Sequence, residues 1–499
     1  MINKILTLSS CAMSTAAKVL NRPIILSSVL ALYSLNTFAE VTLPALICDN
    51  AVLQQQSNVA IWGKSTQKTV KVITSWDNKS YKTNVEKDGT WLLKVDTPEA
   101  SYESYNIEIS DKDSDIQLNN ILVGEVWLAS GQSNMKVPMV GNPSQPIEGS
   151  AEMILKAKPQ LPIRMFTVPE KYSFTLVDDC DGAWVMNERA EVANFGATPY
   201  FFAHYLQNVL EVPVGIINCS WGSSTLEAWM PKEVLESYNK DYDFSLLENQ
   251  KVTELPQKDA TVLYNGMMHS LENYKIKGMI WYQGEANRAN HKEYPALFSL
   301  FAKTLRERFD SGDFPIYYAQ IAPFGFGKEQ DNIDMRISQA SIMHTVERTG
   351  MVVLSDVGEY SCIHPRRKRE VGTRFAYWAL GDAYGYDGID YRAPECVELI
   401  PLKSKKGGPN SIGLVFDNAK MGLSLATQKM SENFEVAGED GIFYPAKMSV
   451  TRKAKHHIVL SSDKVEDILA VRYGYKAYFE GDVFNNFGIP ISSFSKSVK

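Results

Sequence analysis

Residues from about 120 to 389 alternate two kinds of segment, and this alternation constrains the fold more than any other feature of the chain. Compact apolar runs rich in β-branched residues predict buried strands at 121–129, 214–218, 279–282, 315–321 and 351–354. Between them, stretches of helical period predict helices at 294–308 and 367–380. Such an alternation is typical of a mostly parallel sheet that is covered by helices on both sides.

The segments on either side of this region have a different pattern, in which short runs alternate apolar and polar residues. Runs at 71–76 and 81–85, with Asp88-Gly89 as a hairpin signal, predict an N-terminal β domain over residues 40–119. Further runs at 411–416, 447–451, 457–460 and 468–473 predict a C-terminal β domain over 390–499, expected to be a sandwich. The α/β catalytic domain is expected to occupy 120–389.

The first 39 residues have the pattern of a signal peptide. Lys4, Lys18 and Arg22 precede an apolar run at 23–35, and small residues then stand at the −3 and −1 positions of a cleavage site after Ala39. A membrane anchor is disfavoured, because spanning a bilayer takes about 20 apolar residues and this run is shorter. We therefore expect export to the periplasm or the extracellular space, with no membrane attachment after cleavage.

Charge and cysteine usage exclude several classes of function. The net charge is −7, with 58 acidic and 51 basic side chains mixed along the chain, so a nucleic-acid partner is not expected. Cleavage would leave Cys48, Cys180, Cys219, Cys362 and Cys396, an odd number without paired spacing. Neither C-x-x-C nor H-E-x-x-H occurs. We expect no disulfide framework, no metal and no cofactor.

Polar residues gather where the predicted strands end. The segments that follow the first three strands named are SGQSNM at 130–135, SWGSS at 220–224 and QGEAN at 283–287. After 351–354 the chain passes Asp356 and Glu359 and reaches Ile363-His364-Pro365. Ligands of open α/β sheets bind at the carboxyl ends of strands. These segments supply the hydroxyl, the base and the oxyanion donors that acyl transfer needs.

Three of these motifs carry a resemblance to a known family. GQSNM at 131–135, WYQGEAN at 281–287 and IHPRRK at 363–368 resemble the sialate O-acetylesterase family of SGNH-fold carbohydrate esterases. The resemblance covers nearly all of the chain after residue 39. It implies an SGNH-type three-layer parallel-sheet domain and a serine esterase that removes O-acetyl groups from carbohydrates, above all from O-acetylated sialic acid.

The resemblance also implies residue roles. Ser133 is expected to be the nucleophile and His364 the general base. The N–H groups of Ser133 and Gly222 and the side-chain amide of Gln283 are expected to hold the oxyanion.

The departure from the family is the acid that would orient His364. Many bacterial relatives have Asp directly before Ile-His-Pro, whereas this chain has Cys362. The orienting group is expected to be Asp356, Glu359 or a backbone carbonyl. Asp356 is ranked first because it follows the predicted strand closely.

Other features have a structural as well as a functional interpretation. Gln132, Glu285 and Asn287 either contact substrate or support the loops, and for Glu285 support is favoured. The cations at 366–369 are expected to form a solvated face. Two alternative functions stay open at this point: an acetylxylan or other polysaccharide deacetylase, and a non-catalytic glycan-binding protein with a decayed site.

Overall fold

Seven strands, hydrogen-bonded side by side, form the sheet at the centre of the protein. The computed structural model describes residues 41–403, 410–426, 430–450 and 457–498. The strand order is β13-β12-β11-β7-β10-β8-β9, parallel throughout except for β9 at the edge. The strands are β7 (Asp115–Gly131), β8 (Ile163–Thr167), β9 (Val185–Met186), β10 (Val214–Ser220), β11 (Gly278–Tyr282), β12 (Ile316–Ala319) and β13 (Thr349–Val352). The predicted parallel sheet is confirmed, and β8 is a strand that the sequence patterns did not indicate. The predicted signal peptide lies outside the described residues.

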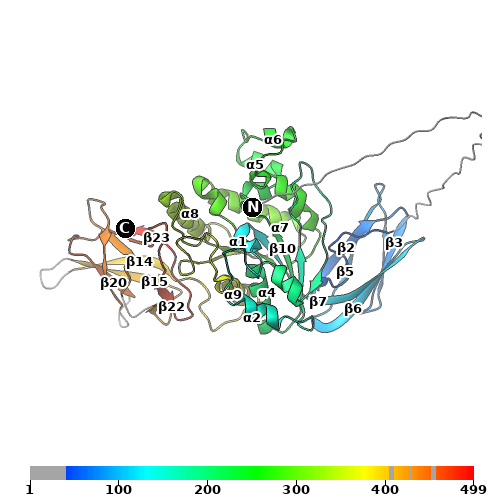
Figure 1. Cartoon of the computed structure of the whole chain (residues 1–499), viewed down its shortest axis with the longest axis horizontal. Coiled ribbons are helices and arrows are strands. Elements are labelled where there is room, and N and C mark those ends of the chain that lie inside the picture. The colour runs from blue at the N-terminus through cyan, green and yellow to red at the C-terminus, as the bar shows by residue number, and fades with distance from the viewer. Residues whose placement is uncertain (1–40, 404–409, 427–429, 451–456, 499) are drawn as a thin grey trace, which may run out of the picture. The chain divides into compact units, whose positions relative to one another are not determined.

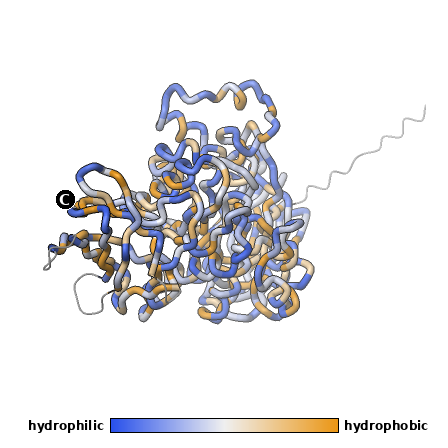
Figure 2. Tube along the Cα trace, turned by 60° about the vertical axis from the view of Figure 1, so that its left-hand side comes forward, coloured by the Kyte–Doolittle hydropathy of each residue, from blue (hydrophilic) through white to orange (hydrophobic). Residues whose placement is uncertain are grey.

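Hydrophobic clusters cover this sheet on both faces. Successive side chains of a strand point to opposite faces; accordingly Val126 and Leu128 belong to one cluster, and Trp127 belongs to another. The first cluster includes residues of α7 (Tyr294–Arg308) and α8 (Glu329–Ile342). The second includes residues of α4 (Ala197–Leu210) and α9 (Lys368–Trp378). Figure 1 shows these helices around the sheet, and in Figure 2 hydrophobic and hydrophilic stretches alternate along the trace.

The remaining helical segments are short. The α-helices are α1 (Ser133–Lys136), α2 (Ser150–Lys156), α3 (Arg189–Asn194), α5 (Lys232–Tyr238) and α6 (Ser245–Glu248). Short segments of 3₁₀ or π type are η1 (Glu227–Trp229), η2 (Pro256–Lys258), η3 (Tyr264–Met268), η4 (His269–Leu271), η5 (Glu285–Asn290) and η6 (Ala379–Ala383). Within the described part of the chain, no helix has the length and apolar character needed to cross a membrane.

The N-terminal strands are β1 (Val52–Gln54), β2 (Asn58–Lys64), β3 (Thr69–Thr74), β4 (Ser80–Asn84), β5 (Thr90–Asp96) and β6 (Ser101–Ser110). Four of the six N-terminal strands, β1, β3, β4 and β6, join the central sheet through β7, whereas β2 and β5 form a separate pair. The first half of β7 pairs antiparallel with β6 and the second half pairs parallel with β10, so one strand runs through the predicted boundary at 119/120. The Asp88-Gly89 turn does not form a hairpin of paired strands, because β4 pairs with β3 whereas β5 pairs with β2.

The C-terminal strands form two four-stranded sheets, β14-β15-β20-β19 and β18-β17-β21-β23, and a two-stranded pair, β16-β22. The bounds are β14 (Glu395–Leu402), β15 (Ser411–Asp417), β16 (Leu423–Leu425), β17 (Phe434–Ala437), β18 (Tyr444–Pro445), β19 (Lys447–Val450), β20 (Ile458–Ser461), β21 (Ala470–Tyr473), β22 (Val483–Asn485) and β23 (Phe494–Ser497). Leu414 of β15 and Val471 of β21 share one hydrophobic cluster. The two sheets therefore pack through a common core, as a sandwich requires.

Candidate active site

Three of the predicted polar segments begin at the same edge of the sheet. Gly131, the last residue of β7, pairs with Ser220 of β10 and with Tyr282 of β11. Gly131 has a φ of +131°, and a Cβ there would lie 2.2 Å from the carbonyl oxygen of Tyr282. Only glycine therefore fits, and the chain turns directly into α1, whose first residue is Ser133.

Ser133 and His364 meet across this edge, as the sequence predicts. His364 lies in the loop between β13 and α9, and its Nε2 is 2.8 Å from the Oγ of Ser133. Both side chains are half-buried, whereas Gln132 and Asn134 on either side of the serine are almost fully buried. The hydroxyl thus faces a surface that substrate can reach and has a base at hydrogen-bonding distance.

The other ring nitrogen of His364 has a partner that sequence reasoning missed. The Nδ1 atom lies 3.1 Å from the Oε1 of Gln145, in the loop between α1 and α2. This loop is held beside the histidine because the backbone N–H of Glu148 donates to the carbonyl of Arg366 at 2.9 Å. A carboxamide oxygen accepts a hydrogen bond from Nδ1–H, and the proton that stays on Nδ1 leaves Nε2 unprotonated and able to accept from Ser133. No motif or periodicity marks Gln145.

The acidic residues expected to orient His364 are engaged elsewhere. Both carboxylate oxygens of Asp356 accept hydrogen bonds of 2.7 Å from Arg374 of α9. Glu359 accepts two hydrogen bonds of 3.1 Å from the side chain of Arg366. The preference for Asp356 is therefore corrected: its position next to β13 is fixed, but its side chain pairs with α9. The thiol of Cys362 lies 3.2 Å from the carbonyl oxygen of His364.

Of the expected oxyanion donors, Gly222 lies next to Ser133, whereas the amide of Gln283 is bonded to other protein groups. Gly222 lies beside the nucleophile, since a Cβ added to it would be 3.5 Å from the Cβ of Ser133. The side-chain amide of Gln283 is fully buried, and its Nε2 donates to the carbonyl of Ser224 at 3.0 Å and to Asn287 at 2.7 Å. Both amide hydrogens are thus used within the protein, so the expectation that Gln283 holds the oxyanion is corrected to a structural role.

Gln132 and Asn287 are buried and support the loops. The side-chain oxygen of Gln132 accepts from the backbone N–H groups of Gly284 and Ala286 at 3.4 and 3.3 Å. Asn287 accepts from the N–H of Leu226 at 2.9 Å, besides its bond with Gln283. These contacts favour the structural interpretation of both residues.

Glu285 is 5% exposed and accepts a hydrogen bond of 2.6 Å from the side-chain amide of Asn134. Its contact also favours structural support over contact with substrate. Burial raises the pKa of its carboxyl group.

The cations at 366–369 do not form a single solvated face. Lys368 is 0% exposed and donates to the side-chain oxygen of Asn134. The expectation therefore fails for Lys368, because the first turn of α9 directs this one side chain inward. Arg366 pairs with Glu359 as described, and Arg369 pairs with Glu152 at 3.1 Å.

Burial and charge determine the protonation of the candidate base. Burial, followed by the charge of Lys368, lowers the pKa of His364 to about 4. Burial lowers the pKa of Lys368 itself to about 7, opposed by the nearby carboxylate of Glu285. At neutral pH the imidazole of His364 is therefore neutral, which is the form that can accept a proton from Ser133.

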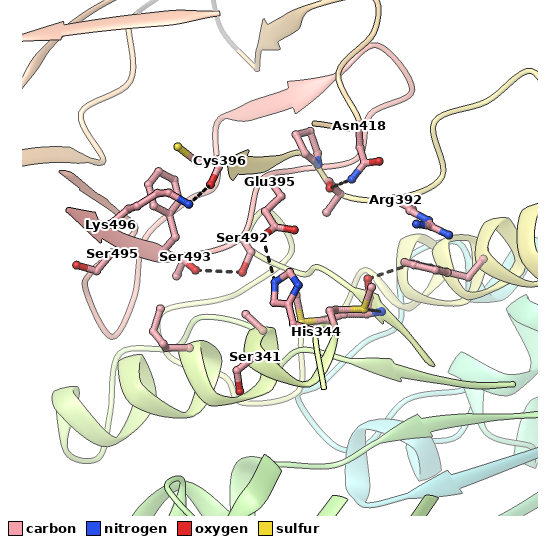
Figure 3. Close-up of a pocket in the computed structure, with 18 residues that line it drawn as sticks. Ser341, His344, Arg392, Glu395, Cys396, Asn418, Ser492, Ser493, Ser495 and Lys496 are labelled. Carbon is pink, nitrogen blue, oxygen red and sulfur yellow. Dashed lines mark hydrogen bonds and ion pairs between the residues drawn. The ribbon is translucent and has the colours of Figure 1, made fainter. Parts of the chain in front are cut away.

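A cavity of about 460 Å³ lies away from these residues, between α8 and strands of the C-terminal sheets (Figure 3). Its polar side chains largely bind protein groups: His344 lies 3.1 Å from Glu395, and Lys496 donates to the carbonyl of Cys396 at 3.1 Å. None of the predicted catalytic residues lines it. The cavity could hold a small molecule by its volume, but neither Ser133 nor His364 lines it, so it is not the site of ester hydrolysis.

Comparisons with known proteins identify the family to which the region around this site is similar. The family described as carbohydrate esterase, sialic acid-specific acetylesterase, matches residues 123–379. The sialate O-acetylesterase of Mus musculus is 26% identical over 412 residues, covering 70% of this chain and 75% of the mouse protein. The Homo sapiens sialate O-acetylesterase is 27% identical over 397 residues, covering 72% and 74%.

A solved structure is also similar. The crystal structure of a carbohydrate acetylesterase from Xanthomonas citri has a TM-score of 0.80 and 29% identity, and the match covers 92% of this chain and 100% of that chain. The comparisons favour neither a polysaccharide deacetylase such as an acetylxylan esterase nor a non-catalytic glycan-binding protein.

Proposed function

The chain belongs to the carbohydrate esterase family of sialic acid-specific acetylesterases, and we propose that it hydrolyses O-acetyl esters of sialic acid with Ser133 as nucleophile and His364 as base. Hydrolysis of carbohydrate O-acetyl esters is the activity that the family and the relatives support. The observation that carries the residue roles is the distance of 2.8 Å between Nε2 of His364 and Oγ of Ser133. The choice of sialic acid as the sugar is supported by the names of the family and of its mammalian members.

The first half of the reaction forms an acetyl-enzyme. The Oγ of Ser133 attacks the acetyl carbonyl carbon while Nε2 of His364 takes the hydroxyl proton. In this proposal the N–H groups of Ser133 and Gly222 donate to the oxyanion of the tetrahedral intermediate. When this intermediate collapses, the bond to the sugar oxygen breaks and His364 returns its proton to that oxygen, which releases the deacetylated sugar.

The second half of the reaction regenerates the enzyme. Water attacks the acetyl group on Ser133 as its proton passes to His364, and the proton then returns to the serine oxygen as acetate leaves. Gln145 keeps the imidazole in the tautomer with hydrogen on Nδ1, but its neutral oxygen does not balance the charge of an imidazolium. In this proposal a carboxamide therefore stands where many serine hydrolases use a carboxylate.

Two further features of this account are proposals that the sequence supports. We propose that the central sheet and its helices form an SGNH-type three-layer domain, flanked by an N-terminal β domain that shares strand β7 with it and by a C-terminal β domain. We also propose that residues 1–39 direct export and are removed, so that the mature enzyme is periplasmic or extracellular. The N-terminal sequence of protein recovered from the periplasm or the medium tests the second proposal.

A substrate comparison tests the proposed function. Purified enzyme is given O-acetylated sialic acid, acetylated xylan and an aryl acetate, and released acetate is measured. The proposal predicts hydrolysis of the sialate ester at a higher kcat/KM than of the xylan ester. A preference for acetylated xylan would overturn the sugar assignment, and failure to hydrolyse any acetyl ester would overturn the activity.

A further inference from the structure

Two buried charged residues next to the active site have no part in the mechanism described so far. Lys368 is 0% exposed and Glu285 is 5% exposed, and Asn134 between them is 1% exposed. Burial of a charged group is unfavourable unless the group is paired and hydrogen-bonded. The chain nevertheless places both residues against Asn134, the neighbour of the nucleophile, so their contacts indicate what they do there.

The side chain of Asn134 connects four segments of the site. Its amide nitrogen donates to Glu285 at 2.6 Å and to the carbonyl oxygen of Ile363 at 3.0 Å. Its side-chain oxygen accepts a hydrogen bond from the ammonium group of Lys368. Because Asn134 follows Ser133 and Ile363 precedes His364, one carboxamide joins the neighbour of the nucleophile to the neighbour of the base.

We propose that Asn134, oriented by Glu285 and Lys368, is the positioning residue that holds His364 at hydrogen-bonding distance from Ser133. This inference rests on the proposed function of that serine and histidine. It concerns the residues behind them, which do not contact the substrate.

The chemistry of the carboxamide suits this task. Glu285 and the carbonyl of Ile363 accept hydrogen bonds, whereas Lys368 donates one, and an amide group supplies two donor hydrogens and an acceptor at once. An aspartate at 134 would still accept from Lys368. It would lose both donated bonds and would place a second carboxylate against Glu285, so the loop that carries His364 would no longer be held.

The ammonium of Lys368 also acts on His364 through its charge. Burial, followed by this charge, lowers the pKa of His364 to about 4. Other titratable or charged groups close by are Cys362 and the Glu359–Arg366 ion pair on the same loop, and Glu285, which reaches the preceding residue Ile363 through Asn134. The backbone of Glu148, before α2, also binds this loop. Near pH 4 Lys368, with its pKa lowered to about 7, is protonated and opposes the imidazolium.

Steady-state kinetics with an aryl acetate test the positioning role. We expect Asn134→Ala and Asn134→Asp to lower kcat by about 10²-fold with little change in KM, because a shift of the base by about 1 Å impairs the chemical step. The thermal unfolding temperature identifies variants that remain folded. A folded Asn134→Ala enzyme with the wild-type kcat would overturn the proposal.

The pH profile supplies a readout that loss of packing alone would not move. Lys368→Met removes the repulsion on the imidazolium, so the acid limb of kcat/KM should move to higher pH. Arg369→Met is the matched control: it removes a charge one residue away that is exposed and paired with Glu152, and it should leave that limb in place. An acid limb unmoved in Lys368→Met, or moved equally in Arg369→Met, would contradict the role of Lys368.

Two further variants keep these tests decisive. If Lys368→Met does not fold, the double variant Lys368→Met with Glu285→Gln removes both buried charges, and the same shift of the acid limb is expected. Ser133→Ala in the same assay separates the two levels of the argument. If Ser133→Ala is inactive while folded Asn134→Ala is fully active, only the positioning inference fails; if Ser133→Ala is active, the proposed function fails.

Discussion

Replacement of Gln145 tests how His364 is oriented. Gln145→Leu removes the oxygen that lies 3.1 Å from Nδ1, at a half-buried position where a side chain of similar size fits. The imidazole then lacks the acceptor that selects the tautomer with hydrogen on Nδ1. Gln145→Glu preserves the shape and replaces the neutral acceptor by a carboxylate, so the two variants change the same contact in opposite directions.

The size of the effect follows from the kind of hydrogen bond. A neutral hydrogen bond contributes about 0.5–1.5 kcal/mol net, and about 1.4 kcal/mol corresponds to a tenfold change in rate. We therefore expect Gln145→Leu to lower kcat by about tenfold or less. Loss of a charged triad partner, by contrast, costs about 10⁴ in kcat. The measured loss of kcat therefore distinguishes a neutral hydrogen-bond partner of His364 from a charged one.

The assay is kcat and kcat/KM for an aryl acetate over a range of pH. In Gln145→Glu the new carboxylate stabilises the imidazolium, so the acid limb should move to higher pH and kcat should not fall below that of the wild type. A loss near 10⁴ in Gln145→Leu would show that the partner of Nδ1 is far more important than a neutral hydrogen bond. An unchanged rate and profile in both variants would show that Gln145 does not orient His364.

Three further outcomes follow from the site. Asp356→Asn should lower the free energy of unfolding by about 3 kcal/mol, because it breaks a buried ion pair with Arg374. The kcat of the folded variant should stay close to that of the wild type. Denaturant titration and steady-state kinetics measure the two quantities, and a large loss of kcat would restore Asp356 as the acid. Gln283→Ala should cost about 1–3 kcal/mol of stability by leaving buried groups unpaired, while kcat of folded enzyme falls less than the roughly 10²-fold expected for an oxyanion donor. The wild-type kcat/KM should decline only as pH falls toward about 4, since the imidazole of His364 becomes protonated there; a decline centred near 6.5 would contradict the lowered pKa.

The sequence predicts β7, β10, β11, β12 and β13 of the central sheet, though not β8 or β9, and it predicts the meeting of Ser133 and His364. Buried parallel strands have a strong apolar signature, and residues after their carboxyl ends converge at one edge of the sheet. Gly131 is an example: it pairs with the ends of β10 and β11 at the point where the chain turns toward Ser133, so the segments after all three strands start close together.

The partners of the site residues could not be predicted, because they depend on side-chain direction and on loop paths. Asp356 is close to the strand end as expected, yet its carboxylate binds Arg374. No pattern in the sequence predicts that these two residues pair. Gln145 reaches His364 through a loop that lacks periodic residues. Helix α8 is largely polar in sequence, so its apolar face was not recognised.

The most direct test of the account is acetate release by Ser133→Ala compared with the wild type. With an acetylated sugar that the wild-type enzyme hydrolyses, we expect kcat to fall by about 10⁴ or more while the unfolding temperature stays close to that of the wild type. Mass spectrometry after treatment with a fluorophosphonate should locate the adduct on Ser133 in the wild type. A folded Ser133→Ala enzyme that retains most of its activity would contradict the account.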